Sequence, residues 1–182
     1  MNKAIMLSKM QENIKFVFKE VINTCHSYFC KHGSDFLTNV KPSIGKLTNL
    51  VNGSSKNICN TKNGYISLAQ NIFNIIYIPG KIEFGHARFA SDLICKRLHM
   101  IGLFPRGDSY IIPPLCTEEL ILINKKIRKN KAKKTKIKYI PKTIKEIRDN
   151  KEYKRVVKAL NEVAKANGTT PYLWELEQWN NL

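Results

Sequence analysis

The sequence predicts a mainly α-helical protein. The alternative is an α+β fold in which a small sheet accompanies the helices. Apolar residues recur every three or four positions in several segments, which is the period of an amphipathic helix. Residue pairs typical of helix N-termini, such as Thr143 with Glu146, punctuate the C-terminal part. Of the 182 residues, 43% are hydrophobic, so the chain is able to build a core. This composition excludes a wholly disordered or collagen-like protein.

Residues 1–30 are expected to form an N-terminal amphipathic helix. Its apolar residues fall at helical spacing, and charged residues such as Glu12 and Lys15 lie between them. No apolar run approaches the roughly 18 residues of a transmembrane helix, and the N-terminus lacks a clean signal-peptide core. We therefore expect an intracellular protein, cytoplasmic or in the nucleoid or nucleus, without a membrane partner.

A loop-rich linker is expected over residues 31–64, which are rich in Gly, Ser and Asn, before a central core of residues 65–124. In that core an apolar run ends at Pro79-Gly80 and is followed by four alternating residues. This pattern predicts a small two- or three-stranded sheet near residues 72–84 and 109–112.

Two further helices are predicted in the central core. The first runs from about His86 to Ile101, with an apolar stripe on one face and charged residues on the other. On that charged face, Arg88 and Asp92 have the i, i+4 spacing of a surface ion pair. The second helix follows Thr117, a possible cap, and has acidic residues in its first turn.

Residues 125–182 form the last segment, a basic stretch followed by a C-terminal helical hairpin. Asp149 with Glu152 has the spacing of a helix N-cap and its supporting acid. An apolar stripe then predicts a helix that Gly168 ends, and Pro171 begins another.

The positive charge of the chain is concentrated in one stretch. The formal net charge is +17, and residues 125–158 hold sixteen basic and only three acidic residues. Such a block repels itself in water unless an anion neutralises it, so a polyanion is the expected partner. Because 25 Lys against 6 Arg also fits an AT-rich coding sequence, the location of the charge is more informative than its total. The residues expected to bind nucleic acid are Lys125, Lys126, Arg128, Lys129, Lys131, Lys133, Lys134, Lys136, Lys138, Lys151, Lys154, Arg155 and Lys158.

Residues 156–179 resemble the generic helix-turn-helix segment of DNA-binding proteins, with Ala164 four positions before the turn glycine Gly168. The resemblance favours DNA slightly over RNA as the partner. The second helix departs from the pattern, because it carries Glu175 and Glu177 and no Lys or Arg. The alternative is a hairpin that packs on the core through its tryptophans. On either interpretation the leading function is nucleic-acid binding without catalysis.

Two other functions remain open. A metal-independent, ribonuclease-like nuclease would use His86 as general base, Arg88 and Arg106 to stabilise a phosphoryl group, and Asp108 or His99 as a second acid-base group. Alternatively, the basic stretch would dock on an acidic protein partner, which would make the chain a protein-interaction or assembly module.

The five cysteines do not form the even set of a disulfide scaffold and are expected to be reduced. Cys25, His26, Cys30 and His32 are ligand types for zinc, but they lack a second clear pair and part of the set falls in an apolar helix. No glycine-rich phosphate loop or dinucleotide fingerprint is present. We therefore expect neither a metal nor a cofactor.

Overall fold

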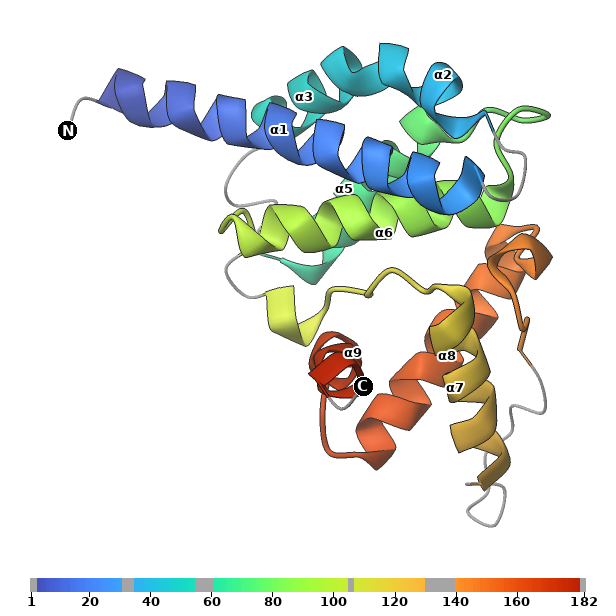
Figure 1. Cartoon of the computed structure of the whole chain (residues 1–182). Helices are drawn as coiled ribbons and strands as arrows, with labels where there is room; N and C mark the ends of the chain where they lie inside the picture. The colour runs from blue at the N-terminus through green and yellow to red at the C-terminus, as the bar shows by residue number, and fades with distance from the viewer. Residues whose placement is uncertain (1–2, 31–34, 55–60, 105–106, 130–139, 181–182) are drawn as a thin grey trace.

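Helix α6 lies at the centre of the fold, with α1 and α5 packed along it and α7, α8 and α9 gathered beneath it (Figure 1). The computed structural model describes residues 3–30, 35–54, 61–104, 107–129 and 140–180. The helices are α1 (Lys3–Cys30), α2 (Phe36–Val40), α3 (Ile44–Gly53), α5 (Lys62–Ile76), α6 (Phe84–Met100), α7 (Thr117–Lys129), α8 (Asn150–Ala166) and α9 (Pro171–Asn180). Short 3-10 turns are η1 (Lys41–Ser43), η2 (Gly107–Ser109) and η4 (Ile144–Glu146).

The prediction of a mainly helical protein is confirmed, but the expected sheet is wrong, because the described residues contain no strand. The apolar run forms α5, which Thr61 caps by accepting a hydrogen bond from the Gly64 N–H at 3.0 Å. Tyr65, Leu68, Ile72 and Ile76 follow the helical three-and-four spacing, and all four are buried. That spacing buries one face of a helix, which the β-branched composition of the run had obscured.

The turn within the expected strand pair does form, but it joins two helices. Gly80 adopts a φ of 77°, the left-handed region that favours glycine, and the Lys81 N–H donates to the Ile78 carbonyl at 3.0 Å. The second part of the expected sheet, residues 109–112, contains the end of η2 and a stretch without regular structure. There the Ile112 N–H donates to the Tyr65 hydroxyl at 3.0 Å instead of to a strand.

The described part of the expected linker is helical. In α2 and α3 the side chains of Phe36, Val40, Leu47 and Val51 are buried and join the core alongside α1. The Gly, Ser and Asn residues of this segment led to the prediction of a loop. The four apolar residues lie at helical spacing, and burying their side chains stabilises two short helices. The helix predicted for residues 1–30 is confirmed as α1.

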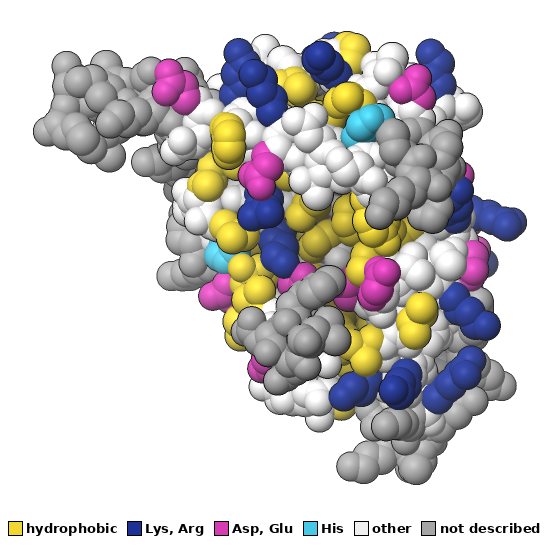
Figure 2. Space-filling view, viewed as in Figure 1, with side chains coloured by type: hydrophobic (Ala, Val, Ile, Leu, Met, Phe, Trp, Pro, Cys, Tyr) yellow, Lys and Arg dark blue, Asp and Glu magenta, His cyan; other side chains and the backbone are white. Residues whose placement is uncertain are grey.

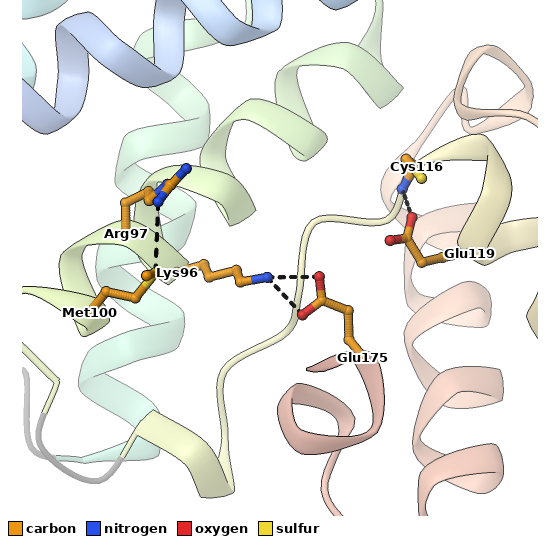
Figure 3. A network of polar contacts seen from close by, with 6 residues as sticks. All are labelled: Lys96, Arg97, Met100, Cys116, Glu119 and Glu175. Carbon is orange, nitrogen blue, oxygen red and sulfur yellow. Dashed lines mark hydrogen bonds and ion pairs between the residues drawn. The ribbon is translucent and has the colours of Figure 1, made fainter. Parts of the chain in front are cut away.

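Helix α7 begins at Thr117, so Cys116 rather than Thr117 is the capping residue. The Glu119 carboxylate accepts a hydrogen bond from the Cys116 N–H at 2.6 Å, which satisfies one of the free donors at the helix start (Figure 3). In α8 the predicted cap is confirmed, because Asp149 accepts from the Glu152 N–H at 2.8 Å. Gly168, with a φ of 69°, then ends the helix as expected.

Helix α9 packs mainly on α8 and η2, and its Trp174 is buried, at 1% exposed. The Glu175 carboxylate forms an ion pair with Lys96 of α6 (Figure 3). Figure 1 shows α9 nearly end-on while α8 lies across the view, so the expected hairpin is a pair of crossing helices. Among the described helices, none is both long enough and apolar enough to cross a membrane.

Candidate functional site

Helix α8 presents a row of basic side chains on its outer face, here called the α8 stripe: Lys151, Lys154, Arg155 and Lys158. These residues are spaced i, i+3, i+4 and i+7, which places them on one side of the helix, and all four are exposed. The opposite side carries buried residues such as Leu160, which fix the helix to the core. The orientation of the stripe toward solvent therefore follows from the burial of the other face.

No carboxylate within the described ranges lies within 4.0 Å of a basic group of the α8 stripe. The same holds for the described basic side chains of α7, of which Lys125 and Arg128 are exposed and Lys126 is half-buried. Figure 2 shows several Lys and Arg side chains over the lower part of the molecule, and others over its upper part and right edge. The positive charge of α7 and of the α8 stripe is left without a partner within the described fold, so it remains available to an external anion.

Other residues of the predicted binding set fall outside the description. Residues 131–138, with five of the expected lysines, and the side chain of Lys129 lie outside the described part of the chain. Within the described residues, a hollow of about 320 Å³ on α7 is lined by Lys125, Arg128 and Lys142. Lys142, which was not among the residues expected to bind nucleic acid, thus lies with two residues that were.

Next to the α8 stripe, a cavity of about 430 Å³ lies between α5, α6 and α8. Ser109, Tyr110 and Ile112, together with the first residue of α9, Pro171, complete its lining. Its lining includes Lys154 of the stripe and Lys62, the first residue of α5. Concave sites of a few hundred Å³ with a few polar groups are where small ligands usually bind. We call this the central cavity.

Arg88 lies in the wall of the central cavity and is 6% exposed. Its guanidinium carbon lies 3.8 Å from the ring centre of Phe73 and 4.8 Å from that of Tyr153. One Nη donates to the Gln70 side-chain oxygen at 2.6 Å and lies 3.4 Å from that of Asn150. The Nε is buried and has no hydrogen-bond partner in the described residues. Aromatic faces and neutral amides, rather than a carboxylate, therefore hold this buried cation.

Asp92 lies one turn further along α6 and is 2% exposed. Burial raises its pKa from 3.8 to about 7, although the hydrogen bond from Tyr153 and the charge of Arg88 both lower it. The Tyr153 hydroxyl donates to the Asp92 carboxylate at 2.8 Å. The expected surface pair of Arg88 and Asp92 is wrong: both side chains are inside, because α5 and α8 cover this face of α6. No ion pair joins them.

Of the described residues of the nuclease hypothesis, His99 and Asp108 meet, whereas His86 and Arg88 lie apart from each other. His86 is 2% exposed and stacks on the Phe29 ring, with centroids 4.0 Å apart, whereas Arg88 lines the central cavity. Asp108 accepts from His99, whose Nε2 lies 2.8 Å from its carboxylate. Arg106 lies outside the described residues.

Both ring nitrogens of the remaining acid-base candidate, His99, form hydrogen bonds within the fold. Its Nδ1 is hydrogen-bonded to the Phe104 carbonyl and its Nε2 to Asp108, so both ring nitrogens face acceptors within the fold. A ring with both nitrogens engaged has none left to take a proton from a substrate. Among the described residues, the His99–Asp108 pair is therefore the part of the nuclease hypothesis that the structure brings together, and it lies apart from His86.

The cysteines contribute no metal site in the described residues, which hold no cluster of three or more His, Cys, Asp or Glu with metal-binding geometry. Cys25 is fully buried in α1, and burial raises the pKa of its thiol. His32 and the side chain of Cys30 lie outside the description.

Sequence reasoning missed most of the central cavity. Gln70, Asn150 and Tyr153 come from helices far apart along the chain, so no local motif links them to Arg88. One signal was present, because Asn150, Tyr153, Val157 and Asn161 recur at helical spacing along α8 beside its apolar stripe. That row marks the side of α8 that faces the cavity.

Comparison of the chain with protein-family models, curated proteins and solved structures gave no match. The geometry of the α8 stripe and of the central cavity is therefore what supports a functional proposal.

Proposed function

We propose that this protein binds nucleic acid, without catalysis, through the α8 stripe and the basic end of α7. The observation that carries the proposal is a row of exposed Lys and Arg side chains with no carboxylate within ion-pair distance in the described fold. Protein surfaces that bind no polyanion normally intersperse both signs of charge, which lowers the self-repulsion of such a row.

The spacing of the stripe suits contact with a phosphate backbone. Residues three and four apart on a helix lie about 5–6 Å apart, which is comparable with the separation of successive phosphates along a strand. Each lysine or arginine that neutralises a phosphate releases condensed counterions, so affinity falls steeply with salt. Contacts of this kind position the chain on the nucleic acid without reading its sequence.

The resemblance to a helix-turn-helix segment favours DNA over RNA, but α9 contributes little charge to such contact. Glu175 is buried in the ion pair with Lys96, and the exposed residues of α9 include Glu177 and Leu173. The proposal therefore places the main contacts on α8 and α7, and both kinds of nucleic acid belong in the test.

The test is a binding titration of the full chain with labelled duplex DNA, single-stranded DNA and single-stranded RNA across a salt series. Reversing three stripe charges, Lys151→Glu, Arg155→Glu and Lys158→Glu, is expected to weaken binding by at least about tenfold near 0.1 M salt. The slope of log affinity against log salt should fall by about two to three, one for each lost phosphate contact.

The matched control reverses three exposed lysines outside α7 and α8, with the same change in net charge: Lys41→Glu, Lys46→Glu and Lys81→Glu. This variant should lose distinctly less affinity than the stripe variant. Equal losses would mean that only total charge matters and would contradict the stripe as the interface. Absence of binding at low salt would refute the proposed function, and cleavage of the probe would contradict the absence of catalysis.

A further inference from the structure

We propose that the central cavity binds a small organic anion that carries a flat ring, of the size and chemistry of a nucleoside monophosphate. The inference rests on the cavity and not on the α8 stripe. It can therefore hold whether or not the chain binds long nucleic acids, although Lys154 belongs to both sites.

Arg88 is a buried cation whose hydrogen bonds and charge are only partly compensated within the described fold. Taking a guanidinium out of water costs several kcal/mol unless charge and hydrogen bonds compensate for it. Here the compensation is incomplete, since its Nε has no partner and no described carboxylate lies within ion-pair distance. A cation of this kind in the wall of a cavity is suited to a phosphate or carboxylate, which a guanidinium binds through two parallel hydrogen bonds.

The described lining of the central cavity carries more positive than negative charge. It includes Arg88, Lys62 and Lys154, and Asp92 is its one described acid. The two lysines are exposed, Lys62 at the start of α5 and Lys154 in the second turn of α8, whereas Arg88 lies inside. Positive charge thus continues from the surface into the cavity, which draws an anion inward.

The uncharged part of the cavity lining suits a flat ring. Tyr110 and Tyr153 are partly exposed and line the cavity together with apolar side chains such as Ile112 and Val157. Aromatic faces of this kind stack on nucleobases, and amide side chains such as Asn161 are able to hydrogen-bond a base edge. A volume of about 430 Å³ falls within the range of pockets that hold small ligands.

The test is isothermal titration calorimetry of the full chain with AMP, adenosine, ribose 5-phosphate and inorganic phosphate. AMP should bind, and the three probes that lack the ring or the anion should each bind at least about fivefold more weakly, because stacking and the charged contacts are each expected to contribute. No heat of binding at millimolar AMP would overturn the proposal. Equal binding of AMP and ribose 5-phosphate would overturn its ring component.

Two variants test the residues. Arg88→Met removes the charge but keeps a long unbranched side chain among the aromatic rings, and it should weaken AMP binding at least about tenfold. Since a buried cation is lost, its melting temperature should not fall. Lys62→Glu changes an exposed residue in the first turn of α5, where an acid suits the helix dipole, and should weaken AMP binding with the fold intact.

Lys81→Glu, an exposed charge reversal in the turn before α6, is the matched control and should leave AMP binding unchanged. If Arg88→Met folds and binds AMP as the natural chain does, the proposal fails. If Arg88→Met does not fold, Lys62→Glu decides: unchanged AMP binding by that variant would likewise overturn the proposal.

The ligand has two possible sources, a free nucleotide or the end of a strand. Competition with short oligonucleotides separates them, because a strand end should displace AMP only when it carries a 5′-phosphate. The triple stripe variant separates this inference from the proposed function. It should lose nucleic-acid affinity and still bind AMP. Lys62→Glu should instead lose AMP binding and keep its affinity for nucleic acid.

Discussion

Lys96 on α6 places its ammonium nitrogen 2.7 Å from both carboxylate oxygens of Glu175 on α9 (Figure 3). The Glu175 side chain is 3% exposed and that of Lys96 15%, so the pair is largely withdrawn from water. The pair fixes α9 to the central helix. It also explains how an acidic residue comes to lie on the inner face of the last helix.

We expect Lys96→Met to lower the free energy of unfolding by about 3–5 kcal/mol, because it leaves the Glu175 carboxylate buried without its partner. The double variant Lys96→Met with Glu175→Leu should recover most of that loss, since no buried charge remains. Urea unfolding measures both. The matched control is Arg97→Met, which breaks an exposed ion pair with Glu20 at 3.4 Å and should cost no more than about 1 kcal/mol. Similar costs for the two single variants would contradict this account.

Asp92→Asn should change how stability depends on pH. Burial raises the Asp92 pKa from 3.8 to about 7, so between these values the folded chain holds a proton that the unfolded chain releases. The contribution of this carboxyl therefore falls as pH rises from about 4 to 7 and is constant above that range. Asparagine does not titrate and still accepts from the Tyr153 hydroxyl.

The measurement is urea unfolding of Asp92→Asn and the natural chain at several pH values between 4.5 and 8. The stability of the variant relative to the natural chain should rise through this interval and then level off. A relative stability that is constant or falls with pH would show that the Asp92 carboxyl is not held in its neutral form by burial.

Gly85→Ala should destabilise the protein, because a Cβ at this position of α6 would overlap the carbonyl oxygen of Ile144 in η4. Either α6 or η4 must shift, at a cost of about 1–3 kcal/mol. Gly45→Ala in α3 is the control, since a Cβ there has no atom within 4 Å and alanine is the better helix former. Thermal unfolding should show a lower midpoint for the first and an equal or higher midpoint for the second. The reverse order would contradict the close packing of α6 on η4.

Asp149→Ala should cost about 1 kcal/mol of stability, because the Glu152 N–H at the start of α8 loses its acceptor. Asp149→Asn retains an oxygen in the same place and should lose only a fraction of this. Urea unfolding of the two variants provides the comparison, and equal losses would show that the side-chain oxygen is not the stabilising group.

Local sequence signals located most of the helices. The apolar period gave α1, α6 and α8, and the Asp149–Glu152 spacing gave the start of α8. The same signals failed in α5, where a run rich in isoleucine suggested a strand although Tyr65, Leu68 and Ile72 lie on one helical face. They also failed in the segment of α2 and α3, where turn-forming residues concealed a short apolar pattern.

Local sequence likewise predicts one part of the candidate site, the α8 stripe, but not the other part, the central cavity. The α8 stripe could be predicted because four basic residues on one helix face remain exposed whenever the opposite face is buried. The central cavity could not be predicted, because Gln70, Arg88 and Asn150 meet only when α5, α6 and α8 pack together. Their separations of 18 and 62 residues carry no local pattern.

The sequence by itself determined that this chain is helical and where its positive charge lies, since the helical period and the order of charges are properties of neighbouring residues. Only the tertiary structure decided which polar faces are covered. Arg88 and Asp92 repeat like surface residues of α6, but α5 and α8 pack over them and leave a guanidinium beside a cavity. The burial of a side chain depends on contacts between distant segments, and these exist only after folding.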